Sequence, residues 1–108
     1  MSPICFQILL ALADADRHGL GIMQEVLERT GGSMRLWPAM LYRNLQKLES
    51  EALIVQVDSP AGPMAGSPRF FHLTTSGRRA CTAEARRLSA FDEVARQKHL
   101  LKRSGPDR

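Results

Sequence analysis

The residues best suited to chemistry lie on one side of a short predicted helix that runs from about Pro38 to Glu51. Its buried side is predicted by leucines at the spacing of one helical face, namely Leu41, Leu45 and Leu48. An outward arginine can bind a guanine edge, a glutamine an adenine edge, and a lysine or tyrosine a phosphate. The expected DNA-contacting residues, including one from a strand later in the chain, are Tyr42, Arg43, Gln46, Lys47 and Arg69. The alternative is a solvated helix face with no binding role.

Two predicted strands follow this helix. Residues 53–58 alternate and are rich in β-branched side chains, and residues 69–73 form a matching run. Between them, Ser59–Pro68 contains three prolines and two glycines, which predict a flexible loop. A helix with a polar outward face followed by such a strand pair is the plan of a winged helix-turn-helix, in which the strand pair and its loop form the wing. The predicted fold class is therefore mainly α with an α+β character.

The N-terminal part of the chain supplies the elements that position the outward-facing helix. Ser2 and Pro3 suit the cap and first residue of a helix that is apolar on almost all sides, so this helix is expected to be buried or shared with a partner. His18 opens the next helix and is expected to make a local hydrogen bond. The expected elements are helices at 4–13 and 20–29, a turn at 17–19, and a brief strand or turn at 33–36.

A long C-terminal helix is predicted from a cap at Thr75 or Ser76 to about Lys102. Its length of about 27 residues corresponds to roughly 40 Å, more than a core of this size covers. The apolar stripe therefore predicts contact with a second copy, assisted by the first helix. The expected homodimer contacts are Phe6, Leu9, Leu88, Phe91, Val94 and Leu101. We expect a winged domain over residues 1–74, and a dimerisation helix with a frayed tail (Ser104–Arg108) over 75–108.

Composition limits the function classes. A chain of 108 residues that is 44% hydrophobic suits one globular domain, and its pI of about 9.7 permits a polyanionic partner. Residues 1–68 carry five basic and seven acidic side chains, whereas residues 69–108 carry ten and four. The positive excess thus lies in the last strand and the C-terminal helix. Arg78 and Arg79 there either reach phosphates or are simply solvated.

No arrangement typical of catalysis or metal binding is present, so an enzyme, a cofactor and a metal site are not expected. Cys5 and Cys81 are far apart and are predicted to be free thiols in the core. The apolar run at residues 4–13 is too short to span a bilayer, and we expect a cytoplasmic protein without a membrane partner. Trp37 has two interpretations, as a ring packed on the wing or first helix, or as a wall of a pocket for a small aromatic effector.

Four segments resemble the PadR family of bacterial transcriptional regulators, over roughly residues 4–90. They are ILLALA (8–13), HGLGIMQE (18–25), LYRNLQKLE (41–49) and FFHLTTSGRRA (70–80). The resemblance implies a homodimeric winged-helix repressor. The two-fold symmetry of such a dimer predicts a pseudo-palindromic operator in double-stranded DNA. The resemblance also implies that the third helix and the wing lie on DNA and that the last helix forms the dimer contact. We further expect a small molecule or stress signal to shift the dimer between two spacings of its reading helices.

Three positions depart from the family pattern. Met40 replaces a hydroxylated residue that could bind phosphate, and Phe70 and Phe71 replace paired tyrosines. The wing also has only one cation, Arg69. These departures keep open a second function class, a winged-helix module for protein interaction or dimerisation with weakened DNA binding.

Overall fold

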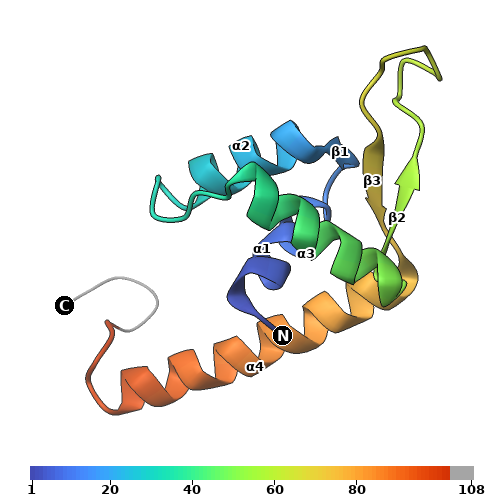
Figure 1. The fold of residues 1–108 in the computed structure, drawn as a ribbon. Coiled ribbons are helices and arrows are strands. Elements are labelled where there is room, and N and C mark those ends of the chain that lie inside the picture. Colours follow the sequence, from blue (N-terminus) through green and yellow to red (C-terminus); the bar gives the residue numbers. More distant parts are fainter. Residues whose placement is uncertain (103–108) are drawn as a thin grey trace.

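The computed structural model describes residues 1–102, which form four helices and a small sheet (Figure 1). In chain order the elements are α1 (Pro3–Ala11), β1 (Arg17–His18), α2 (Gly19–Arg29), α3 (Pro38–Ser50), β2 (Ile54–Val57), β3 (Phe70–Leu73) and α4 (Thr75–Gln97). The fold is mainly α with a β wing, which confirms the predicted winged helix-turn-helix. The predicted frayed tail lies outside the described residues.

Side-chain caps set the beginnings of three helices. The Ser2 hydroxyl accepts a hydrogen bond from the Cys5 amide at 3.1 Å, and His18 Nδ1 accepts one from the Gly21 amide at 2.9 Å, as predicted. The cap of α4 was predicted at Thr75 or Ser76 but is Thr74. The Thr74 hydroxyl accepts from the Gly77 amide at 2.9 Å and donates to the Ala52 carbonyl at 2.8 Å, so it also joins α4 to the turn after α3.

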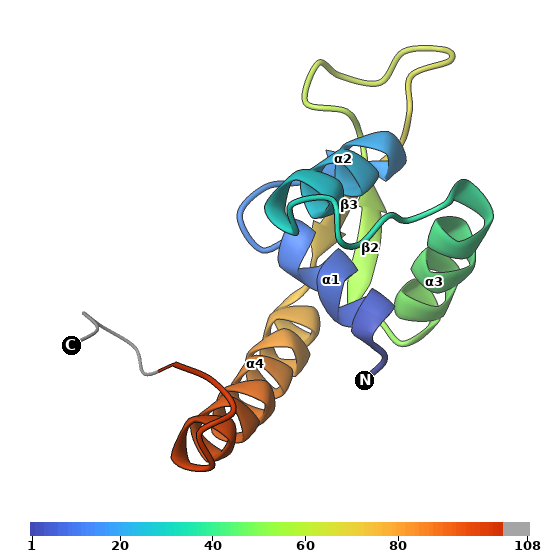
Figure 2. The same cartoon turned by 90° about the vertical axis from the view of Figure 1, so that its left-hand side faces the viewer.

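The core is centred on α1, which packs against α2, α3 and α4 (Figure 2). This position explains why α1 is apolar on nearly all sides. Leu9 is 0% exposed within the single chain, so its predicted role as a dimer contact is wrong. Phe6 stays partly buried at the edge of the core. The largest fully buried side chains are Ile8, Leu9, Ile22, Val26, Leu41, Leu45, Leu48 and Ile54.

The sheet has the order β1-β3-β2 and is antiparallel throughout. Its short first strand lies where a turn was predicted, because Arg17 and His18 pair with Phe71 and Phe70 on the free edge of β3. The brief strand considered for residues 33–36 is not formed. The short strand therefore lies before α2 and not before α3. It forms there because residues 17–18 lie beside the free edge of β3 and can pair with it.

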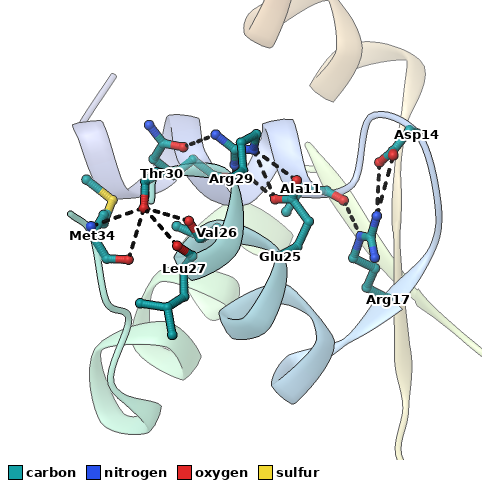
Figure 3. Close-up of polar contacts among 10 residues, drawn as sticks. Ala11, Asp14, Arg17, Glu25, Val26, Leu27, Arg29, Thr30 and Met34 are labelled. Atoms are coloured by element: carbon teal, nitrogen blue, oxygen red, sulfur yellow. Dashed lines mark hydrogen bonds and ion pairs between the residues drawn. The ribbon is translucent and has the colours of Figure 1, made fainter. Parts of the chain in front are cut away.

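Polar contacts hold the end of α2 and the connection to α3 in place (Figure 3). The Thr30 hydroxyl donates to the Val26 carbonyl at 2.7 Å and accepts from the Met34 amide at 3.1 Å. Arg29 pairs with Glu25 at 2.9 Å and donates to the Gln7 side chain of α1 at 2.6 Å. The connection between α2 and α3 is therefore fastened to the end of α2 through Thr30 before α3 begins at Pro38.

Helix α4 extends beyond the rest of the fold and makes the molecule elongated, with extents of 57 × 26 × 24 Å (Figure 1). It ends at Gln97, earlier than predicted, and His99 then adopts a positive φ of 62°. Leu101 therefore lies beyond the helix, which corrects its predicted place on the helical stripe. Leu88, Phe91 and Val94 lie on α4 and are exposed in the single chain.

Candidate nucleic-acid interface

The outward face of α3 is the first part of the candidate interface. Leu41, Leu45 and Leu48 are at most 1% exposed and fix the inward side of the helix. Because side chains three and four positions apart share a face, the opposite side is exposed to solvent. It presents three of the predicted contact residues, Arg43, Gln46 and Lys47. The predicted polarity of this helix is thus confirmed by the burial of its leucines.

A groove of about 580 Å³ separates α3 from the wing and the beginning of α2. Three predicted contact residues meet there, namely Tyr42, Gln46 and Arg69. Arg43 and Lys47 are not part of its lining, and Lys47 instead borders a second hollow beside Cys5 and the N-terminal residues. The predicted set is therefore divided between the groove and the outer surface of α3.

Gly19 leaves room for the end of the Tyr42 side chain between α2 and α3. A Cβ atom at Gly19 would lie 2.5 Å from the Tyr42 hydroxyl oxygen. The Tyr42 side chain therefore occupies the space that any other residue at position 19 would fill. The sequence pattern did not single out Gly19, because the contact joins residues that are far apart in the chain.

The wing carries less positive charge than its sequence suggests. The Arg69 guanidinium forms an ion pair with the Asp58 carboxylate at 2.6 Å across the base of the wing loop. No charged residue lies in the loop itself, residues 59–68. Gln56 on β2 also donates to the Glu49 carboxylate of α3 at 3.1 Å, which ties the wing to that helix. The Asp58 carboxylate therefore offsets the positive charge of Arg69.

Trp37 lies at the beginning of α3 beside α2, and not against the wing or the first helix as one interpretation predicted. Its large hydrophobic side chain is exposed, with 61% of its surface accessible to solvent. The Arg35 guanidinium lies 5.4 Å from the ring centroid, and the ring borders a hollow of about 260 Å³. The apolar lining of that hollow includes Leu20, Met23, Leu27 and Leu36.

Within residues 1–102, the two cysteines and the one buried carboxylate do not form a reactive centre. Cys5 and Cys81 are free and buried. Burial raises the pKa of the Cys81 thiol, opposed by the positive charge of Arg78, so the thiol stays protonated at neutral pH. The pKa of the Glu84 carboxyl is lowered chiefly because Arg87 donates hydrogen bonds to it at 2.6 and 2.9 Å. Glu84 therefore acts as the ion-pair partner of Arg87.

The profile of the family described as "Transcriptional regulator PadR-like family" matches residues 8–83. This range contains the end of α1, all of α2 and α3, the wing and the first part of α4, and so the whole candidate interface. The chain belongs to the PadR-like family of transcriptional regulators. No curated protein sequence matches this PadR-like chain at a significant level. Within residues 1–102, no helix has the length and hydropathy needed to cross a membrane.

Solved structures with the same fold come from several bacteria. A PadR family transcription regulator from Clostridium difficile R20291 is 25% identical, with a TM-score of 0.76 over 89% of this chain and 97% of that one. A transcriptional regulator from Clostridium thermocellum is 17% identical, with a TM-score of 0.74 over 86% and 89%. A PadR-like transcription factor from Bacteroides fragilis is 22% identical, with a TM-score of 0.67 over 87% of each chain.

The departures of this PadR-like protein from the family pattern have structural explanations. Met40 is half-buried and packs against the core, so an apolar side chain suits its surroundings. Phe71 is buried in the core, and Phe70 makes an edge-to-face contact with His18 at 5.2 Å between ring centroids. The aromatic pair therefore joins the wing to α2 through apolar contact.

Proposed function

We propose that this protein is a homodimeric repressor that reads a pseudo-palindromic DNA site with α3. The observation that carries the proposal is the outward face of α3. In the part of the chain that the structure describes, Arg43 and Lys47 have no carboxylate partner, so both charges are free to meet DNA. Membership of a family of transcriptional regulators supports the assignment.

The proposed reading geometry follows from the sizes of the elements. A helix of 13 residues such as α3 is about 20 Å long and fits a major groove about 12 Å wide. Arg43 would bind a guanine edge, Gln46 an adenine edge, and Lys47 and Tyr42 phosphates. The wing would lie along the adjacent backbone, with Arg69 released from Asp58 by a phosphate.

The proposed dimer uses the apolar side of α4. The buried side of α4 at Gly77, Cys81 and Glu84 packs against the core around α1. At helical spacing, the same side continues into Leu88 and Phe91, beyond the reach of α1. An apolar face of this kind is stabilised by a second copy, and two-fold symmetry would then match a pseudo-palindromic site.

Arg43→Ala and Lys47→Ala are expected to have different effects on DNA binding. Loss of a bidentate base contact at Arg43 should cost about 1–3 kcal/mol and relax the base preference at one position per half-site. Loss of a phosphate contact at Lys47 should weaken all duplexes alike and lower the salt slope by about one unit per contact. Selection from a random DNA pool followed by anisotropy titrations at several salt concentrations measures both effects.

Arg96→Ala is the matched control for this experiment, because it removes an arginine at the far end of α4 that is already paired with Asp92. It should leave both site choice and salt slope unchanged. If Arg43→Ala and Lys47→Ala bind the selected site as the wild type does, α3 is not the reading helix.

A small aromatic effector completes the proposal, with Trp37 as its contact. Arg35 covers one part of the indole, and the apolar hollow beside Trp37 offers room for a planar ring to stack. Such a ligand would contact the connection that leads into α3, and it would shift the dimer toward the arrangement to which it binds more tightly.

Titration with planar aromatic compounds is expected to quench Trp37 fluorescence saturably. Trp37 is the only tryptophan in the chain, so the signal comes from one site. Leu20→Glu, at the edge of the hollow, should weaken the quenching because it places a charge where the ligand would bury apolar surface. A fluorescence change with DNA but none across a broad aromatic panel would assign Trp37 a purely structural role.

A second candidate function is supported by the neutral wing. The ion pair between Arg69 and Asp58 and the uncharged loop favour a winged module that binds protein more than DNA. A salt titration with random duplex separates the two functions, since phosphate contacts impose a steep dependence of affinity on salt. A flat salt dependence would support the protein-binding module.

A further inference from the structure

Cations without a carboxylate partner gather on a second element besides α3. Five arginines of the described chain are held by carboxylates, namely Arg17, Arg29, Arg69, Arg87 and Arg96. In contrast, within residues 1–102 neither Arg79 nor Arg86 has a hydrogen-bond or ion-pair partner. In the same part of the chain, Arg78 donates only to the Ala13 carbonyl oxygen, at 3.0 Å. These three arginines are all in the first half of α4.

The three arginines border one shallow hollow of about 350 Å³ on the surface of α4. Its other lining residues are small or hydroxylated: Thr75, Thr82 and Ala83. This surface, which we call the α4 arginine face, lies opposite the buried side of the helix. Arg79 and Arg86 are seven residues apart, so their backbone positions are separated by about 10 Å along the helix axis.

The chemistry of this face fits a phosphate backbone. Guanidinium groups bind phosphate oxygens through paired hydrogen bonds, and threonine hydroxyls are common phosphate contacts. The face has no large apolar side chain of the kind that anchors a protein–protein interface. The one carboxylate among residues 75–86, Glu84, is 8% exposed on the opposite side of the helix and is bonded to Arg87.

The α4 arginine face is separate from the proposed reading face. Helix α1 packs against both α3 and α4 and lies between them (Figure 2). Since Arg79 and Arg86 are on the side of α4 away from the core, they point away from α3. The apolar stripe proposed for the dimer also continues the buried side of α4, so the arginine face stays open when two copies associate.

We propose that the α4 arginine face is a second binding surface for the phosphate backbone of double-stranded nucleic acid, independent of base sequence. Because α1 lies between α3 and α4, a duplex held on α3 is expected to lie away from the arginine face of the same protomer. The surface therefore gives the protein the capacity to hold a second duplex segment in addition to the one that α3 reads.

The test measures the binding of a short random-sequence duplex to full-length variants by anisotropy over a range of salt concentrations. Arg43→Ala/Lys47→Ala removes the α3 contacts and is expected to retain salt-dependent binding. Adding Arg79→Ala/Arg86→Ala should lower the log–log salt slope by about 1.8, which is roughly 0.9 per phosphate contact. When salt is raised from about 50 to 200 mM, the variant that also lacks Arg79 and Arg86 should lose about tenfold less affinity than Arg43→Ala/Lys47→Ala does.

The matched control adds Arg96→Ala/Lys98→Ala to the same background. It removes the same charge from the other end of α4 and should leave the slope unchanged, and circular dichroism confirms that each variant is folded. Three results would overturn the proposal: no duplex binding by Arg43→Ala/Lys47→Ala, no effect of Arg79→Ala/Arg86→Ala, or an equal effect of the control pair.

An acidic protein segment is the other occupant that the test distinguishes. Binding of a polyglutamate peptide that is lost in Arg79→Ala/Arg86→Ala, with duplex binding unchanged, would assign the face to protein and overturn the proposal. The proposed function is tested separately, because a failure of Arg43→Ala to change site choice leaves the α4 measurements intact.

Discussion

Gly77→Ala is expected to destabilise the fold by about 3 kcal/mol, near the upper end of the range for overpacking. The added methyl group would overlap the Leu53 carbonyl oxygen and lie 2.7 Å from the Leu73 side chain. Backbone does not move aside easily, and this carbonyl also accepts a hydrogen bond from the Thr74 amide at 3.1 Å. The loss is a large share of the 5–15 kcal/mol that usually stabilises a domain.

Thermal unfolding followed by circular dichroism measures the effect. For a chain of this size, a loss of about 3 kcal/mol lowers Tm by roughly 12–24 °C. This expected loss is the net effect, after the higher helix propensity of alanine has offset up to about 1 kcal/mol of the clash. Because Gly77 lies in the first turn of α4, the substitution separates this helix from the turn after α3.

Gly19→Ala is the matched control, since it adds the same methyl group at another buried glycine. There the overlapping atoms are the hydroxyl and ring end of Tyr42, a half-exposed side chain that can rotate away. We expect a stability change within about 1 kcal/mol, because only a side chain must move. Equal destabilisation by both substitutions would show that the backbone contact at Leu53 is not the cause.

Phe91→Asp is expected to convert the proposed dimer to a monomer. Phe91 is 59% exposed in the single chain, so the substitution leaves the monomer core intact, but it would place an unpaired charge in the dimer contact. Such a change costs about 3–5 kcal/mol, or roughly 100- to 1,000-fold or more in the dissociation constant. Sedimentation velocity at micromolar concentration measures the outcome, and affinity for the selected pseudo-palindromic site should fall with it.

Ser89→Asp is the matched control for the dimer. It adds the same charge to an exposed position of α4 two residues away, on nearly the opposite side of the helix from Phe91. This variant should remain dimeric. A Phe91→Asp protein that sediments as the wild-type dimer would remove α4 from the proposed interface.

Local pattern was sufficient to predict most of the elements. The leucine spacing of α3, the β-branched strand after it and the caps at Ser2 and His18 each depend on residues within one or two helical turns. The outward Arg43 and Lys47 followed from the same periodicity. The winged fold could therefore be predicted, because its signals are short in range along the chain.

Contacts between distant residues decided the rest. Arg17 and His18 have no strand signal of their own and became β1 only because β3 has a free edge. Leu9 is one of many apolar residues in α1, and only the packing of three helices around it showed that it is buried in the core. The end of α4 before Leu101 also differed from a prediction based on helix propensity alone.

The positive charges show most clearly what the sequence determines and what the tertiary structure decides. The sequence by itself determined how many cations the chain carries and that most lie in its last third. Only the tertiary structure decided which of them are available, by pairing Arg69 with Asp58 and leaving Arg79 and Arg86 free within the described residues. The physical reason is that a carboxylate neutralises a cation only within a few ångströms, and the folded backbone sets that distance.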